Sequence, residues 1–278
     1  CEATTQDLTG KIALVDRGTC AFTQKALNAQ KAGAKAVIVA NTDASGAVFQ
    51  MGGEENQVRI PAVMVNLADG EKLRSTSGIN ATERIKAVQP LMVDGDIDSD
   101  VVFHEYGHGL TWRMVGNMSG KLAGAIGEGA SDVVAFMMNG DDRIGEFSAS
   151  NAVGIRRAPY AGYPRTYKDV AGEIVHDDGE IYAAAMWRLK ELFMANGINE
   201  SLLWDYFIDG MNYTPATPAF ENMRDGMLQA ASARGGTAHR CYIWQAFAQF
   251  GIGAGAKGVA TDTGVTITES FALPTECQ

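Results

Sequence analysis

The chain has 278 residues, of which 46% are hydrophobic and 20% are charged, a normal balance for a globular protein and enough length for two domains. Its 33 acidic and 23 basic side chains give a formal net charge of −10. This charge argues against nucleic acid as a partner, because that function needs a basic face. No apolar run reaches the length of a membrane span.

The first ninety residues predict a small α/β unit. Apolar runs indicate strands and amphipathic runs indicate helices, with strands expected at 11–16, 35–40, 61–66 and 84–93 and helices at 22–32 and 67–75. The β-α-β order implies parallel pairing of the strands. No histidine occurs before His104, so this part of the chain lacks a convincing catalytic set.

The most informative stretch is His104-Glu105-Tyr106-Gly107-His108. Residues four apart share one face of a helix, so His104 and His108 can bind one metal ion together. Glu105 can then reach a water molecule on that ion. The spacing therefore predicts the zinc site of a metallopeptidase, with Glu105 as the general base.

The third ligand decides the subclass, because a catalytic zinc ion keeps three protein ligands and one open position. Thr111 and Met114 stand where the metzincin pattern needs Gly and His, which excludes that subclass. Glu128 and Asp132 lie four apart on a second apolar helical stretch at 124–138. We predict Glu128 as the third ligand. Asp132 is predicted to accept a hydrogen bond from a zinc-bound histidine and so to fix its tautomer.

An acidic run before the zinc helix, Asp94, Asp96, Asp98 and Asp100, resembles the start of an EF-hand loop. Ser99 stands where that loop requires Gly, so the EF-hand interpretation fails. Asp98 or Ser99 is predicted instead to be the N-cap of the zinc helix, where acidic side chains are favourable. Calcium stays open as a second cofactor in this class of peptidase.

Residues 91–278 resemble the fungalysin family of secreted zinc metallopeptidases, which are relatives of thermolysin. The matching words follow the family order: DGD at 94–96, HEYGHGLTWR at 104–113, GEGASD at 127–132, GIRRAPY at 154–160, VHDDGE at 175–180, CYIWQAFA at 241–248 and GIGAGA at 251–256. The resemblance implies protein or peptide substrates and an extracellular location. It implies nothing about the oligomeric state.

The resemblance also carries the roles of the family onto matching positions. His104, His108 and Glu128 would bind one zinc ion, and Glu105 would be the catalytic base. His176 would be the catalytic histidine that hydrogen-bonds the oxyanion of the transition state.

Arg156 matches the arginine that binds a substrate carbonyl and supports the zinc-ligand glutamate. Arg157 could take that role instead, because the two are adjacent and a shift of one residue in the alignment exchanges them.

Residues 1–90 resemble the protease-associated (PA) domain over GKIALVDRGTCAF at 10–22 and KALNAQKAGA at 25–34. By resemblance this domain would act as a lid, a substrate filter or a docking surface. A spacer that only helps folding is the alternative.

The expected fold is thus an α/β PA-like domain at 1–90 followed by a mainly α, thermolysin-like catalytic lobe at 91–278. Further helices are predicted in this lobe at 181–195, 201–209, 221–233 and 242–250. The tail at 259–273 alternates only weakly and is expected to be irregular. In this family a β-rich lobe precedes the zinc helix, whereas this chain has only the PA-like module there. We expect either that the lobe was removed together with an earlier segment or that the PA domain interrupts it.

Two disulfides suit the four cysteines, and we favour Cys1–Cys20 and Cys241–Cys277, because each domain would then close its own loop. The chain starts without an initiator methionine or a signal peptide, so a processed or excerpted chain is expected.

Two functions of different classes stay open: a secreted zinc endopeptidase, or a non-catalytic binding fragment made of a PA module and an incomplete peptidase lobe. A third option, a PA-containing aminopeptidase, is disfavoured because that class does not normally use His-Glu-x-x-His.

Overall fold

A computed structural model describes residues 2–18, 20–42, 48–49, 51–53, 55–84, 94–261 and 264–278. The chain divides into two compact units, Cys1–Leu91 and Met92–Gln278. Most of the strand predicted at 84–93 lies outside the described residues, and so does Cys1 of the predicted Cys1–Cys20 disulfide.

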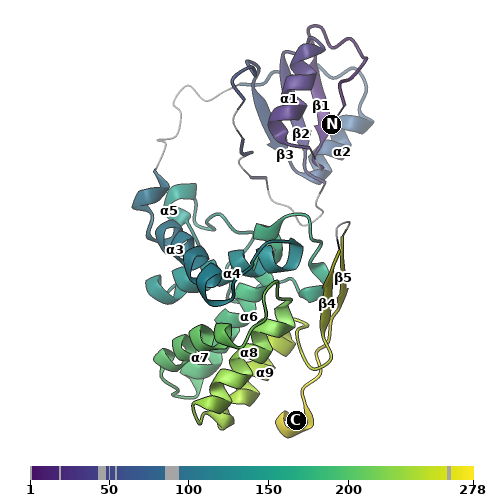
Figure 1. Ribbon diagram of the computed structural model, residues 1–278. Coiled ribbons are helices and arrows are strands. Elements are labelled where there is room, and N and C mark those ends of the chain that lie inside the picture. The colour runs from purple at the N-terminus through teal and green to yellow at the C-terminus, as the bar shows by residue number, and fades with distance from the viewer. Residues whose placement is uncertain are drawn as a thin grey trace. The chain divides into compact units, whose positions relative to one another are not determined.

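The first unit is built on three parallel strands, β1 (Ile12–Asp16), β2 (Ala36–Ala40) and β3 (Ala62–Val65), in the order β1-β2-β3 (Figure 1). Helix α1 (Phe22–Lys31) connects β1 to β2, and α2 (Leu67–Ser75) follows β3. Apolar side chains from these elements and from the connection between α1 and β2 form the buried core: Ala13, Ala26, Ala29, Ala34, Val37, Val39 and Met64. The elements predicted from 11 to 75 are confirmed to within one residue at each end.

The second unit is mainly helical. Its α-helices are α3 (Ser99–Met114), α4 (Lys121–Asn139), α5 (Glu146–Ala149), α6 (Val175–Ala195), α7 (Glu200–Asn212), α8 (Phe220–Ala233) and α9 (Arg240–Gln249). The described residues also form the short 3-10 helices η1 (Gly95–Ile97), η2 (Tyr167–Asp169), η3 (Thr237–His239) and η4 (Thr275–Cys277). Helix α4 packs between α3 and α6, and α7, α8 and α9 lie together beyond α6 (Figure 1).

Large apolar side chains hold this helical lobe together. Phe136 on α4, Tyr182 and Phe193 on α6, Phe220 on α8 and Phe247 on α9 are all fully buried in one cluster. Because burial of apolar surface is the main favourable contribution to folding, this cluster fixes how α4 and α6 cross.

Two details of the second unit differ from the sequence prediction. The tail is not irregular: β4 (Lys257–Ala260) pairs with β5 (Val265–Thr268) as an antiparallel hairpin. Val265 and Ile267 face the helical core, and this packing supplies the alternation that was weak in sequence. Helix α6 begins at Val175, six residues before the predicted start at Ile181, so His176 lies inside its first turn.

The two helix crossings at the site are close because glycine stands at each contact. A Cβ atom on Gly107 of α3 would lie 2.6 Å from Ser131 Cα on α4. A Cβ atom on Gly129 of α4 would lie 2.2 Å from the carbonyl oxygen of Gly179 on α6. Side chains there would push the helices apart, so these glycines bring the candidate site residues of α3, α4 and α6 within reach of one another.

The predicted Cys241–Cys277 disulfide is confirmed and joins the first turn of α9 to η4 near the C-terminus. In the part of the chain that the structure describes, no helix combines the length and the apolar character needed to cross a bilayer.

Candidate metal centre

Helix α3, which carries the His-Glu-x-x-His motif, begins at a cap made by Asp98. Its Oδ1 accepts a hydrogen bond from the backbone N–H of Asp100 at 3.0 Å, and its Oδ2 accepts one from the N–H of Ser148 at 2.8 Å. Asp100 Oδ2 accepts from the N–H of Gly145 at 2.8 Å. Of the two predicted N-caps, Asp98 and Ser99, Asp98 is the one that the structure shows. These acidic side chains bind backbone donors that join α3 to α5, and this arrangement offers no support for calcium.

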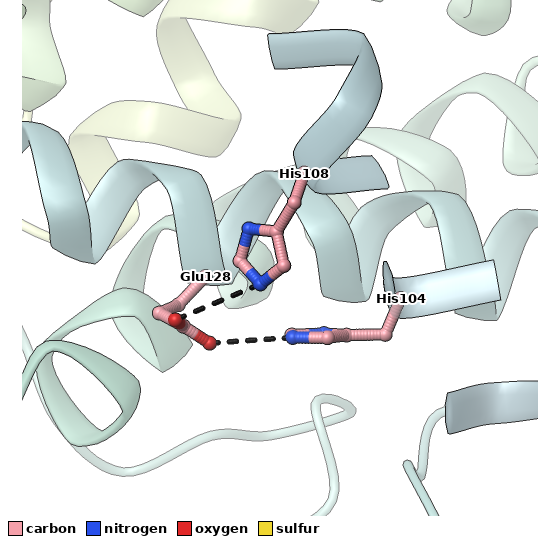
Figure 2. Close-up of side chains that lie close together, drawn as sticks. All are labelled: His104, His108 and Glu128. Carbon is pink, nitrogen blue, oxygen red and sulfur yellow. Dashed lines mark ion pairs between the residues drawn. The ribbon is translucent and has the colours of Figure 1, made fainter. Parts of the chain in front are cut away.

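Three side chains from α3 and α4 point toward one another (Figure 2). His104 Nε2 lies 3.3 Å from Glu128 Oε2, and His108 Nε2 lies 3.7 Å from Glu128 Oε1. The ligand atoms of the three residues all lie within 4.8 Å of one another. The group can therefore hold one metal ion.

The donor set fits zinc, which binds imidazole nitrogen and carboxylate oxygen and keeps an open position in catalytic sites. Glu128 Oε2 is buried and makes no hydrogen bond, although the imidazoles of His104 and His176 lie beside it. A buried carboxylate oxygen without a donor is costly unless a cation satisfies it. This orphaned oxygen is the structural observation that favours a metal ion at the centre.

The opposite nitrogen of His104 faces a buried group of three side chains, which we call the Asp132 cluster: Asp132, Arg156 and Tyr160. Asp132 Oδ1 lies 2.6 Å from His104 Nδ1. Arg156 donates two hydrogen bonds to Asp132, from Nε at 2.6 Å and from Nη2 at 2.7 Å. The hydroxyl of Tyr160 donates a further bond to Asp132. With Asp132 as the acceptor, Nδ1 of His104 carries the proton and Nε2 is left to bind a metal.

The charges of this cluster shift the pKa values of its members. Burial alone would raise the pKa of Asp132, but the Arg156 charge and the hydrogen bonds from His104 and Arg156 hold it well below its usual range. Burial alone would lower the pKa of His104, but the carboxylates of Asp132 and Glu128 outweigh it and raise that pKa to about 9. A cation bound at Nε2 would take the place of that extra proton. Burial lowers the pKa of His108, which favours the neutral, metal-binding form.

The side of the centre that faces solvent carries the two candidate catalytic residues. Glu105 is exposed on α3, and its charge acts on His108. His176, in the first turn of α6, has a side chain that is 57% exposed, and its Nε2 lies 3.2 Å from Glu128 Oε2. The structure thus brings the predicted catalytic histidine to the same glutamate as the two predicted histidine ligands.

The two adjacent arginines have different surroundings. Arg156 is buried, and its guanidinium binds Asp132 rather than Glu128. Arg157 donates its backbone N–H to Glu180 at 3.1 Å, and its side chain pairs with Asp177. Arg156 is therefore the arginine tied to the metal centre, through Asp132 and His104.

Sequence reasoning missed two residues near the centre, Tyr160 and Glu180. Both lie inside sequence motifs that matched the fungalysin pattern, but neither stands at a spacing that indicates a metal ligand or a catalytic residue. The fourth histidine of the sequence, His239, lies at the end of η3 and is half-buried, with Nδ1 2.8 Å from the Tyr206 hydroxyl and its ring against Phe193.

Two histidines and a glutamate on adjoining helices of a helical lobe form a site that could hold a metal ion, as a metallopeptidase requires. Residues 19–256 match the model of the fungalysin metallopeptidase (M36) family, so the chain belongs to the fungalysin family.

The curated relatives that match this chain carry names that agree with the family assignment. The extracellular metalloproteinase MEP of Fusarium vanettenii is 34% identical over 217 residues, which cover 65% of this chain and 33% of that protein. The extracellular metalloproteinase mep of Aspergillus fumigatus is 33% identical over 199 residues, covering 59% of this chain and 31% of the relative. The MEP of Pyricularia oryzae is 33% identical over 217 residues, covering 65% and 34%. The chain spans about a third of the length of these relatives.

Proposed function

We propose that this chain carries the catalytic zinc centre of an extracellular metalloendopeptidase that hydrolyses peptide bonds of proteins. One observation carries the proposal: the ligand atoms of His104, His108 and Glu128 converge within 4.8 Å beside an exposed glutamate, Glu105, and a third histidine, His176, which is exposed. The extracellular location rests on the names of the relatives.

In this proposal His104, His108 and Glu128 would hold one zinc ion, which would supply Lewis-acid polarisation of the substrate carbonyl. The carboxylate of Glu105 would accept a proton from the attacking water molecule and donate it to the leaving amine. His176 donates a hydrogen bond from Nε2 to the oxyanion that develops on the substrate.

The buried residues then have positioning and binding roles. Asp132 keeps His104 in the tautomer that presents Nε2, and Arg156 holds Asp132 in its charged form. Binding of a substrate carbonyl by Arg156 stays a prediction, and it requires an Nη atom that remains able to donate alongside its two bonds to Asp132.

The first ninety residues keep their predicted role as a PA domain next to the catalytic region at 91–278. Their three parallel strands and two helices are compatible with that module. A role as a lid, a filter or a docking surface, the question of an upstream β-rich lobe and a calcium ion stay predictions of the family resemblance.

The experiment is a comparison of zinc content and casein hydrolysis in the chain, in His108→Ala and in Glu105→Gln, with a longer form of the protein assayed in parallel. We expect one zinc ion in the chain and in Glu105→Gln, and less than stoichiometric zinc in His108→Ala. Hydrolysis should fall at least ~100-fold in Glu105→Gln, the scale of losing a general base.

Removal of zinc by a chelator should abolish hydrolysis, and added zinc should restore it. Full zinc in His108→Ala would contradict the ligand set. Stoichiometric zinc with no hydrolysis in either form would favour the alternative, a non-catalytic binding fragment.

A further inference from the structure

We propose that Glu180 is a positioning residue for catalysis: it anchors the Arg156–Arg157 segment to α6 and thereby orients His176. This inference rests on the function proposed above.

The first observation is the burial of Glu180. The residue is 1% exposed, although a carboxylate loses much of its hydration when it is buried and must be compensated by donors. Its Oε2 accepts hydrogen bonds from the Tyr163 hydroxyl at 2.8 Å and from the backbone N–H of Arg157 at 3.1 Å. Both donors belong to the connection between α5 and α6, so Glu180 fastens that connection to α6.

The second observation is how Arg157 bridges α6. Its backbone binds Glu180, while its guanidinium pairs with Asp177, the residue after His176. His176 and Glu180 are four residues apart and therefore lie on one side of the helix. One arginine thus holds the helical turn of His176 at two points.

The third observation is that the first turn of α6 needs such anchors. Its N-cap is Ile174, which provides no side-chain hydrogen bond to the turn. In the described part of the chain, no hydrogen bond is made to the imidazole of His176, whose polar contact is the ion pair with Glu128. The direction of the His176 side chain therefore depends on where its helical turn is held.

Orientation matters because an oxyanion donor must sit within a few tenths of an ångström of its place. Misplacement by about 1 Å can cost ~10²-fold in rate. We expect Glu180→Ala to lower kcat by roughly 10-fold to 10²-fold, with little change in KM or zinc content, because the lost precision concerns a bond made mainly in the transition state.

Glu180→Gln should recover most of the lost kcat. Its amide oxygen can accept from the Arg157 N–H, and its amide group can donate to the Tyr163 oxygen. Tyr163→Phe removes one of the two donors without a change of shape and should give an intermediate loss. These two variants test the proposal even if Glu180→Ala fails to fold.

Glu221 offers a matched control. Its carboxylate also accepts from a tyrosine hydroxyl, that of Tyr167 at 2.8 Å, and from a backbone N–H, that of Gly258 at 2.9 Å. It lies at the start of α8, and in the described part of the chain it has no hydrogen bond or ion pair with His176 or Arg157. Glu221→Ala should lower the melting temperature but leave kcat per zinc-loaded molecule unchanged.

The decisive test is a double-mutant cycle with His176→Ala. If Glu180 acts through His176, then Glu180→Ala should cost no further kcat once His176 is gone. An equal loss in both backgrounds, loss of zinc, or a raised KM with kcat intact would overturn the proposal.

A second measurement needs no turnover. The imidazole NMR signals of His176 in the zinc-loaded chain should shift in Glu180→Ala and stay in place in Glu221→Ala. Unchanged His176 signals in Glu180→Ala would overturn the positioning role, whereas an inactive wild-type chain with shifted signals would count against the proposed function alone.

Discussion

The two nitrogens of His104 face two very different regions of the molecule. Nδ1 faces the Asp132 cluster, where Asp132 is 1% exposed and accepts hydrogen bonds from His104, Arg156 and Tyr160. Nε2 faces Glu128, whose Oε2 has no hydrogen bond, and the exposed His176 beyond it. On the buried side both carboxylate oxygens of Asp132 accept hydrogen bonds, while on the open side Glu128 Oε2 keeps a lone pair for a cation.

This contrast suggests a division of roles between the two sides. A buried, fully hydrogen-bonded cluster costs much free energy if one partner is removed, because the remaining charge is left uncompensated. Exposed groups contribute little to folding and can be arranged for chemistry. Substitutions on the buried side should therefore act on stability and zinc affinity, and those on the open side on turnover.

The largest expected effect is on the buried side. Arg156→Met removes the charge that compensates Asp132, so the free energy of unfolding should fall by about 3–5 kcal/mol. Urea unfolding of the zinc-loaded chain measures this loss. Arg234→Met is the control, because its pairs with Asp205 and Asp209 are exposed to solvent, and it should change the unfolding free energy far less. Similar losses in both variants would contradict the contrast.

The next effect belongs to the open side. His176→Ala should lower kcat by roughly 10²–10³-fold, the scale of removing one oxyanion donor, and KM should change little. Zinc content should not change, since His176 is not one of the three ligands. Steady-state kinetics with zinc analysis checks both points, with His239→Ala as a histidine control remote from the centre. If zinc left the protein in His176→Ala, the division between the two sides would be wrong.

The sequence was sufficient where local spacing determines geometry. The four-residue intervals between His104 and His108 and between Glu128 and Asp132 place each pair on one helix face. The N-cap at Asp98 and the three strands before residue 66 also follow from local patterns. These features need no knowledge of distant partners.

The sequence was insufficient where a long-range contact decides the structure. Glu180 is an ordinary helical glutamate in sequence, and only the crossing of α6 with the segment around Arg157 and Tyr163 buries it. The β4–β5 hairpin was missed for a similar reason, because Val265 and Ile267 become an apolar face only when they pack on the helical lobe. The early start of α6 depends on Asp178, whose carboxylate accepts from the backbone N–H groups of Ala171 and Gly172.

A pH measurement extends the contrast to a second buried carboxylate, that of Glu180. Burial raises the pKa of Glu180 to about 7, although the Arg156 charge and the bonds from Tyr163 and Arg157 oppose it and Asp177 adds to it. The folded state then binds the proton more tightly than the unfolded state, whose carboxyl titrates near its ordinary value of 4.5. Stability from this group is therefore complete below that value and is lost as pH rises toward and through about 7.

The chain should lose about 2–3 kcal/mol of unfolding free energy relative to Glu180→Gln between pH 5 and pH 8. Urea unfolding of both proteins at the two pH values measures this difference, and other titrating groups cancel in the comparison. A difference that did not change with pH would show that Glu180 is already ionised at pH 5.

The smallest expected effect tests how far support for the metal extends from its ligands. Tyr160→Phe removes one donor from Asp132 and leaves the bonds from Arg156 and His104 in place, so the fold should persist. Asp132 then holds His104 less firmly, and zinc affinity should fall by about tenfold, the lower end of the range for partners of metal ligands.

Tyr163→Phe is the matched control for Tyr160→Phe, because it makes the same chemical change three residues further on, where the hydroxyl serves Glu180 instead of Asp132. Competition with a zinc chelator measures both affinities. We expect weaker zinc binding in Tyr160→Phe and none of that loss in Tyr163→Phe, since only the first hydroxyl touches the carboxylate that orients a ligand. Equal affinities would show that Arg156 alone holds Asp132 in place. Equal losses of zinc affinity would show that any change in the buried hydrogen bonds weakens zinc binding, and that the hydrogen bond between Asp132 and His104 has no special role.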